Sequence, residues 1–211
     1  MRLWGRATSV NVQKVIWALA ELGLDCERID AGGRYGGLDT PEFLAMNPNA
    51  RVPVLQHGGL VLFESNAIVR HLARTRGAGS LLPDDEAGLA LADQWMDWAA
   101  TTLSPGFIAL FWEAVRKPPS QRSSERLETL AREAGELYRV ADARLAASPF
   151  LCGSRLTSGD IPVAATLYRY FDMAIDRPAL PALERWYEGL ADRPAYRSSV
   201  MTDYSPLIGR D

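Results

Sequence analysis

The hydrophobic pattern of the chain changes once along its length, and this change most constrains the fold. Residues 1–77 alternate short strand-like runs with helical runs in the order βαβαββα. Past residue 88 no convincing strand follows, and only helical periodicity remains. This order predicts an α/β domain over residues 1–77, a linker over residues 78–87 and an all-α domain over residues 88–211.

Local signals place the elements of the first domain. Apolar residues at helical spacing predict a helix over residues 12–22, and residues 40–42 start a second one with a cap followed by proline. Ser65 is expected to cap a third helix. The glycine-rich residues 32–37 are expected to form a mobile loop. Strands are expected at residues 2–5, 26–30, 52–56 and 60–62.

The second domain is predicted to be a helical bundle. Leu91, Trp95 and Trp98 share one face of its first helix, and the prolines of residues 117–119 break the helical run. Residues 161–171 are apolar nearly all round, which predicts a buried central helix. A longer helix before the central one carries an apolar stripe, formed by Leu127, Leu130, Ala134, Leu137, Ala141 and Leu145. Two short helices are expected after the central one, over residues 183–190 and 195–201.

A capping box is expected just before the central helix. Thr157 and Asp160 have the spacing of such a box, and Leu156 and Ile161 are placed as a hydrophobic staple. We therefore assign these residues to folding and give them no catalytic role.

Composition excludes several classes of function. The 211 residues carry a formal net charge of −3, which argues against a nucleic-acid partner, and no apolar run is long enough to cross a membrane or serve as a secretory signal. The two cysteines lie far apart and only two histidines are present, so no metal site is expected. The absence of a disulfide framework fits a reducing, cytoplasmic location.

Two runs carry a resemblance to a known family. Residues 43–55 (FLAMNPNARVPVL) are followed by residues 63–68 (FESNAI), with the hairpin between them. These runs resemble the cytosolic glutathione transferases, most closely the bacterial theta-like and nu-like members. The resemblance covers nearly the whole chain. It implies a thioredoxin-like N-terminal domain, a helical C-terminal domain, and glutathione as co-substrate without a metal.

The resemblance implies a glutathione cradle around Val52, Pro53, Glu64 and Ser65. It implies a cis Val52-Pro53 bond, whose outward-facing Val52 N–H and C=O pair with the cysteinyl backbone of glutathione. Ser65, at a helix start, would bind the γ-glutamyl carboxylate, and Glu64 would accept the ammonium. The alternatives from the residues alone are a proline at a strand edge and a plain helix cap beside a solvated glutamate.

Two arginines are candidates for the glycine carboxylate of glutathione. Arg51 precedes Val52, and its fork suits a carboxylate, although a solvated surface charge is the alternative. Arg34, in the glycine-rich loop, is the weaker candidate. Leu38 departs from the polar residue that related enzymes can carry here, which leaves the loop contacts open.

The thiol of glutathione is expected to meet the turn of Ser9 and Asn11. Only a thiolate attacks electrophiles, and neutral donors at a helix N-terminus favour the thiolate. By resemblance, Ser9 matches the theta-like catalytic serine, and both residues match the pair of nu-like enzymes. Either Ser9 or Asn11 can be the main donor to the sulfur, and Thr8 is a less favoured candidate. Helix capping is the alternative role for these residues, and it is compatible with contact to the thiol. No cysteine or tyrosine lies in this turn, which argues against mixed-disulfide and tyrosine-type classes.

The second substrate is expected to meet an apolar wall between the domains. Its candidates are Leu103, Phe107, Phe111 and Trp112, and the alternative for each is core packing. Further candidates stand behind this wall: Tyr168, Met201 and Tyr204.

The leading hypothesis is a glutathione S-transferase that activates glutathione as thiolate for attack on a small hydrophobic electrophile, as in detoxification. One alternative is a glutathione-dependent disulfide reductase or peroxidase that uses the same thiolate. Another is a non-catalytic interaction module built on the same fold. The resemblance also implies a homodimer, in which Asp97 is a faint candidate to reach the partner's glutathione.

Overall fold

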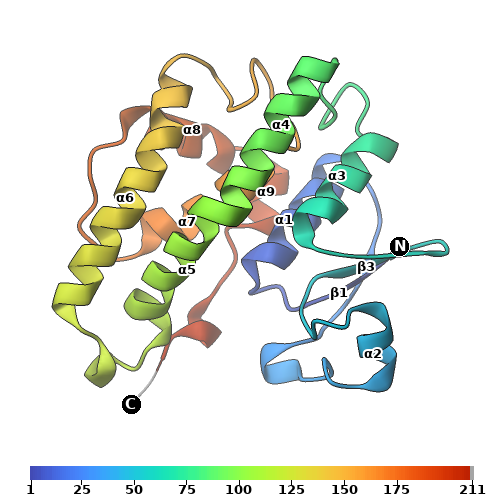
Figure 1. The fold of residues 1–211 in the computed structure, drawn as a ribbon, viewed down its shortest axis with the longest axis horizontal. Helices are drawn as coiled ribbons and strands as arrows, with labels where there is room; N and C mark the ends of the chain where they lie inside the picture. The colour runs from blue at the N-terminus through green and yellow to red at the C-terminus, as the bar shows by residue number, and fades with distance from the viewer. Residues whose placement is uncertain (210–211) are drawn as a thin grey trace.

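The computed structural model describes residues 1–209 and begins with one mixed four-stranded sheet (Figure 1). Its strands are β1 (Arg2–Trp4), β2 (Glu27–Ile29), β3 (Val54–His57) and β4 (Leu60–Phe63), in the order β2-β1-β3-β4. β1 is parallel to β2 and antiparallel to β3, while β3 and β4 form an antiparallel hairpin. The predicted βαβαββα order is confirmed.

Helices cover both faces of this sheet. They are α1 (Val10–Glu21), α2 (Pro41–Met46) and α3 (Ser65–Arg76). Because side chains alternate across a strand, neighbouring residues of β3 join different clusters. Leu55 belongs to the large core with α1 and α3, whereas Val54 packs in a smaller cluster with Phe43 of α2.

The rest of the described chain is helical and forms the other lobe of Figure 1. The helices are α4 (Glu86–Trp98), α5 (Ser104–Phe111), α6 (Ser124–Ala146), α7 (Ile161–Asp172), α8 (Pro181–Ala191) and α9 (Pro194–Ser199). π-helical turns at Ala99–Leu103 and Trp112–Arg116 join α4 to α5 and end the helical run before Lys117, as the prolines predict. Through residue 209 an isolated bridge between Phe150 and Gly153 is the only pairing outside the sheet.

The predicted buried central helix is α7. Most of its residues are buried, and polar side chains of neighbouring helices bond to it. The hydroxyl of Tyr138 donates to Thr166 Oγ1 at 2.7 Å, and the hydroxyl of Tyr196 donates to the Ala164 carbonyl at 2.9 Å. α7 therefore serves as the axis around which the second lobe packs.

α1 is held by both lobes. It contacts α3 in its own lobe and α7 and α9 in the other. The rings of Trp17 and Tyr196 meet edge to face at 4.9 Å. Arg193 forms an ion pair with Glu21 at 2.6 Å, and Gln13 donates to Thr202 Oγ1 at 2.9 Å. These contacts, spread from the first turn of α1 to its last residue, fix the helix relative to the helical lobe.

Three local predictions need adjustment. Ser65 is the first residue of α3 and not its cap; Glu64 occupies the cap position with a φ of 70°. The buried face of α4 consists of Ala92, Trp95 and Met96, whereas Leu91 is 37% exposed. The glycine-rich loop contains a short 3₁₀ turn at Gly33–Tyr35.

The linker between the two predicted domains falls between α3 and α4. α3 ends at Arg76 and α4 begins at Glu86, and the boundaries of the two domains stay a prediction.

A fully buried carboxylate organises the start of α7. Asp160 Oδ1 accepts the Leu151 N–H at 2.8 Å, and Oδ2 accepts the N–H and the hydroxyl of Thr157 at 2.8 and 2.9 Å. Burial raises the pKa of Asp160 to about 6, and these donors oppose that rise. Leu156 and Ile161, expected to form a hydrophobic staple, are both buried, whereas the cap position of α7 is Asp160 and not Thr157.

We expect Asp160→Ala to lower the free energy of unfolding by about 2–4 kcal/mol, because two buried N–H groups lose their acceptor. Denaturant titration at neutral pH measures this loss. The exposed Asp25 makes no hydrogen bond within residues 1–209, so Asp25→Ala is the matched control. Equal stability of the two variants would contradict the structural role of Asp160.

Candidate active site

The N-terminus of α1 presents an unused hydroxyl. Ser9 is the cap residue of α1, with φ −89° and ψ 121°, and its carbonyl accepts the Gln13 N–H at 2.8 Å. Its side chain makes no capping hydrogen bond. The Ser9 hydroxyl therefore stays available at the positive end of a helix, where donors favour an anion.

The starts of α1 and α3 meet at one contact. The Ser65 hydroxyl lies 3.4 Å from Asn11 Oδ1, and Ser65 is buried. The next residue, Asn66, donates to the Met96 carbonyl at 2.7 Å and so ties the first turn of α3 to α4. The structure thus brings together Asn11 and Ser65, which the sequence assigned to two different parts of glutathione.

The loop before β3 is held by a buried amide. Asn47 Nδ2 donates to the Arg51 carbonyl at 2.8 Å, and Asn47 Oδ1 accepts the Asn49 N–H at 3.0 Å. The Val52-Pro53 bond is cis, as the resemblance implies. Within residues 1–209 neither the N–H nor the C=O of Val52 has a hydrogen-bond partner, so both can pair with an extended ligand.

Gly5 lets this loop approach the Ser9 turn. A Cβ placed on Gly5 would lie 2.4 Å from Val12 Cγ2 and 3.3 Å from Val52 Cβ. Only a residue without a side chain fits this contact, and its φ of 152° also favours glycine. Val52 and the beginning of α1 are consequently neighbours.

A buried lysine lies near Glu64. Glu64 is exposed, whereas Lys14 is only 3% exposed. Burial lowers the pKa of Lys14 to about 8, and Glu64 opposes this shift. Sequence reasoning missed Lys14; the available signal was a charged residue between the apolar Val12 and Val15 of the first helix.

The two predicted arginines lie in different surroundings. Arg51 is exposed, and its side chain has no hydrogen-bond partner within residues 1–209. Arg34 donates to the Tyr35 hydroxyl at 2.7 Å and lies over its ring. It lines a cavity of about 600 Å³ together with Thr8 and Trp112. Nothing in the described contacts joins Arg34 to Arg51.

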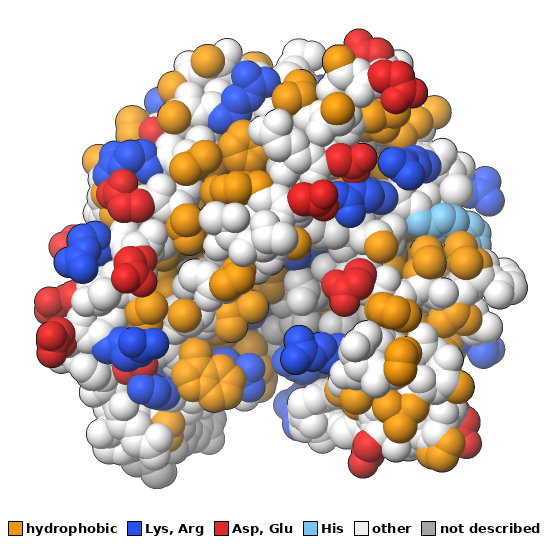
Figure 2. Space-filling view, in the orientation of Figure 1, with side chains coloured by type: hydrophobic (Ala, Val, Ile, Leu, Met, Phe, Trp, Pro, Cys, Tyr) orange, Lys and Arg blue, Asp and Glu red, His pale blue; other side chains and the backbone are white. Residues whose placement is uncertain are grey.

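A second cavity, of about 180 Å³, opens beside the Ser9 turn. We call it the thiol-side cavity. It is lined by both predicted thiol-facing residues, Ser9 and Asn11. Three of the four predicted wall residues line it as well: Phe107, Phe111 and Trp112. Figure 2 shows a hollow between the lobes in the lower half of the molecule, with Lys or Arg side chains on both sides.

The fourth wall residue, Leu103, does not line this cavity. Its side chain is fully buried in the helical core. The Tyr204 ring lies 5.6 Å from that of Phe111 and 6.1 Å from that of Tyr168, so two of the residues expected behind the wall adjoin it. Met201 is half-buried against the core and is not a lining residue.

Three arginines also line the thiol-side cavity and were missed from the sequence: Arg6, Arg116 and Arg169. Arg169 is 3% exposed and donates to the Thr8 carbonyl at 2.8 Å. Burial lowers its pKa to about 10. An arginine inside the otherwise apolar residues 161–171 was a signal that the sequence did offer.

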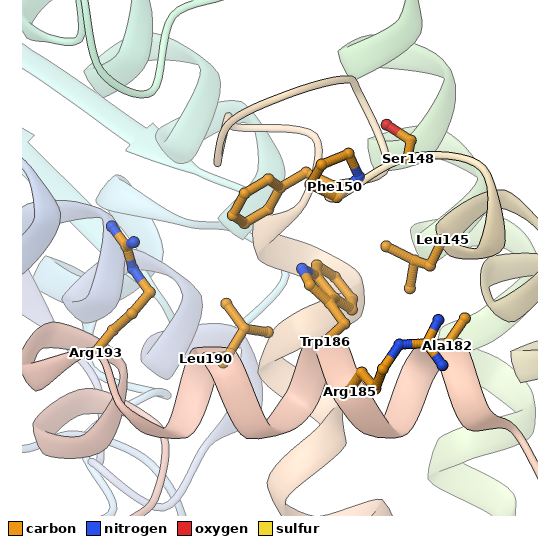
Figure 3. A pocket seen from close by; sticks show the side chains of 10 residues that line it. Leu145, Ser148, Phe150, Ala182, Arg185, Trp186, Leu190 and Arg193 are labelled. Atoms are coloured by element: carbon orange, nitrogen blue, oxygen red, sulfur yellow. The ribbon is translucent and has the colours of Figure 1, made fainter.

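A separate pocket of about 310 Å³ lies between α8 and the end of α6. Figure 3 shows Trp186 and Leu190 of α8 facing Phe150 across it. None of the residues predicted to bind glutathione or the second substrate lines this pocket, so it is distinct from the candidate active site.

Comparisons with known proteins decide the family. Residues 1–74 match the glutathione S-transferase N-terminal domain, and residues 91–194 match the C-terminal domain. The chain belongs to the glutathione S-transferase family. It is 41% identical over 205 residues to glutathione S-transferase GstB of Escherichia coli, covering 96% of this chain and 99% of the relative. Glutathione S-transferase 4 of Zea mays is 33% identical, over 92% and 89% of the two chains.

A solved structure agrees with this assignment. The theta class glutathione S-transferase from Xanthomonas axonopodis pv. citri, crystallised with glutathione bound, is 46% identical. It covers 96% of this chain and 97% of its own, with a TM-score of 0.92. The glutathione S-transferase fold predicted from the sequence is therefore confirmed.

The remaining expectations concern metals and membranes. Among residues 1–209 no group of three or more His, Cys, Asp or Glu side chains is placed to hold a metal ion. None of the helices in the same range has both the length and the apolar character needed to cross a bilayer.

Lys14→Met tests the electrostatics beside this transferase site. Because the folded state lowers the lysine pKa from 10.5 to about 8, the unfolded chain holds more protons between these pH values. The destabilising effect of the charged Lys14 is therefore at its full size below pH 8 and becomes smaller as the pH rises above 8. We expect the free energy of unfolding of Lys14→Met to exceed that of the wild type by about 1–3 kcal/mol at pH 7. Between pH 8 and pH 10 the wild type should become more stable as Lys14 loses its proton, and the variant should lack this increase.

Chemical denaturation across this pH range, on wild type and Lys14→Met, measures the effect. Arg76→Met, at an exposed position on α3, is the control for loss of a surface charge. A Lys14→Met protein with unchanged stability at pH 7 and an unchanged pH slope would contradict the assignment.

Proposed function

We propose that this glutathione S-transferase lays glutathione across Val52 and Ser65 and delivers its sulfur to the corner formed by Ser9 and Asn11. One observation supports the proposal: the Ser65–Asn11 contact joins the expected carboxylate site to the expected thiol site, and Asn11 also lines the thiol-side cavity with its aromatic residues. The sulfur would then face the second substrate directly.

Each part of glutathione has a matching group in this arrangement. The γ-glutamyl carboxylate would bind Ser65 and the backbone N–H groups that begin α3. Glu64 would accept the ammonium, and the backbone of Val52 would pair with the cysteinyl residue. Arg51, which is free to move toward a ligand, would take the glycine carboxylate, with Arg34 as the weaker candidate.

Thiol activation would come from neutral donors and the helix dipole. The Ser9 hydroxyl is not used for capping, and because Asn11 Oδ1 faces Ser65, the amide nitrogen of Asn11 can donate elsewhere. Lowering the thiol pKa by about 2 units corresponds to about 2.7 kcal/mol of preferential thiolate stabilisation. The thiolate would form a C–S bond as the leaving group departs with its electron pair.

The protein's own cysteines do not suit this chemistry. Burial raises the pKa of Cys26, and burial together with Asp160 raises that of Cys152 to about 12. A thiol that stays protonated is a poor nucleophile. The glutathione sulfur therefore remains the favoured nucleophile, with Phe107, Phe111 and Trp112 as the wall for a small hydrophobic electrophile.

The assembly and location of the enzyme belong to the same proposal. We propose a cytoplasmic homodimer, in keeping with the family resemblance and the two free cysteines. Asp97 is a weak candidate for reaching a partner's glutathione, because its carboxylate already pairs with Arg70 of the same chain.

Substitutions in the thiol corner test the mechanism. We expect Ser9→Ala or Asn11→Ala to raise the pKa of bound glutathione by about 1–2 units, because a donor to the thiolate is lost. Ultraviolet titration of the thiolate in the enzyme–glutathione complex measures this pKa. The pH dependence of kcat/KM with an aryl halide gives a second reading.

Ser65→Ala is the contrasting variant. We expect it to weaken glutathione binding about tenfold with little change in the thiol pKa, since it removes a hydrogen bond to a carboxylate. An unchanged pH profile in both thiol-corner variants would overturn their role. Turnover of cumene hydroperoxide or hydroxyethyl disulfide far above that of an aryl halide would replace transfer by reduction as the main activity.

A further inference from the structure

The thiol-side cavity has an unbalanced charge. Three guanidinium groups line it, from Arg6, Arg116 and Arg169, and no Asp or Glu is among the lining residues. Within residues 1–209 no carboxylate forms an ion pair with any of the three. A wall meant only for neutral hydrophobic compounds has no need for three unpaired cations, which disfavour one another at close range.

Two of these arginines have a buried Nε atom without a hydrogen-bond partner in the described chain, although only Arg169 is buried as a whole residue and Arg6 is half-buried. Arg169 is 3% exposed, yet its Nε has no partner in the described chain. Arg6 Nε is likewise buried without a partner there. A buried N–H donor without an acceptor costs free energy, so each of these two Nε–H groups calls for an acceptor that the described protein atoms do not supply.

Aromatic rings orient the guanidiniums without neutralising them. Arg116 lies over the Trp112 ring at 4.6 Å, and Arg169 lies over the rings of Phe111 and Tyr204 at 5.0 and 5.3 Å. A cation–π contact uses the face of a guanidinium, so N–H groups in the guanidinium plane stay available to an anion. The pKa of Arg6 is lowered, mainly by burial and also by the positive charge of Arg116, which agrees with repulsion between these two groups.

The carboxylates of glutathione have their proposed sites elsewhere. Ser65 and Arg51, which we assign to them, do not line the thiol-side cavity, whereas Ser9 and Asn11 do. An anion bound by the arginines would thus belong to the molecule that faces the sulfur. A carboxylate matches the arginine fork geometrically.

We propose that the second substrate of this transferase is a small electrophile that carries a carboxylate, bound by Arg6 and Arg116 above the buried Arg169. This inference rests on the proposed function and adds the substrate class. In the reaction the glutathione sulfur forms a bond to the electrophilic carbon, the halide leaves with the bonding electron pair, and the thiol proton passes to solvent. The carboxylate is unchanged throughout.

An isosteric pair of substrates tests the proposal. 4-(Bromomethyl)benzoate and 4-(bromomethyl)benzamide share the leaving group and ring and differ in charge. At saturating glutathione we expect kcat/KM to be at least tenfold higher for the benzoate, after subtraction of the uncatalysed rates. Raising the salt concentration should lower this ratio, because ions screen a partly exposed guanidinium.

Variants locate the preference. We expect Arg116→Gln to lower the benzoate-to-benzamide ratio about tenfold, and Arg116→Lys to retain part of it. Arg76→Gln removes a charge at an exposed position outside the cavity and should leave the ratio unchanged. Arg116 is the site of choice because it is half-buried and its side chain makes no hydrogen bond within residues 1–209, so its replacement should not unfold the protein.

The outcomes separate this inference from the proposed function. A ratio near one in the wild type, or a ratio that Arg116→Gln leaves unchanged, overturns the inference while thiolate formation at Ser9 stands. If Arg116→Gln instead lowers kcat/KM equally for both substrates and raises the pKa of the glutathione thiol, the arginines act on the thiolate, and the inference is overturned as well. Absence of a bound thiolate in the wild type overturns the proposed function and this inference together.

Discussion

The placement of α1 is the constraint on which the site depends. Its buried face packs on α3, and its other neighbours are α7 and α9 of the helical lobe. The ion pair of Glu21 with Arg193 and the edge-to-face contact of Trp17 with Tyr196 fix one end of the helix. At the other end Arg169 holds the Thr8 carbonyl. The turn that presents Ser9 is thus supported by both lobes, which suits a site that must orient a reacting sulfur.

Charge is distributed unevenly around this turn. Two positive groups, Lys14 and Arg169, are buried, whereas the carboxylate of Glu64, which lies near Lys14, is exposed. Buried cations without ion pairs lower the stability of a folded chain. The same cations attract anions, and both substrates in our account carry negative charge. Binding of anionic substrates would therefore stabilise the folded chain.

The fold and much of the candidate site followed from local sequence signals. Periodicity gave the strands and helices, and the cis Val52-Pro53 bond followed from a recognisable motif. Ser9, Asn11 and Ser65 were proposed because the family resemblance matches them, and each lies at a helix start, where short-range patterns are informative. Their roles stay a prediction, although their proximity is now explained by the packing of α1 on α3.

Long-range convergence explains what the sequence did not reveal. Arg6, Arg116 and Arg169 come from three distant segments, and no spacing rule connects them. Leu103, in the π-helical turn Ala99–Leu103, packs in the helical core, which is the alternative that the sequence left open for every wall candidate. Which apolar side chains line a cavity depends on tertiary packing, so the sequence could not separate Leu103 from Phe107 and Phe111.

A crystal structure of this protein with glutathione bound tests the central claim most directly. The account predicts the γ-glutamyl carboxylate at Ser65, the cysteinyl backbone paired with Val52, and the sulfur within hydrogen-bonding distance of Ser9 Oγ or Asn11 Nδ2. A sulfur beyond contact range of both side chains would contradict the account, whatever the position of the rest of the tripeptide.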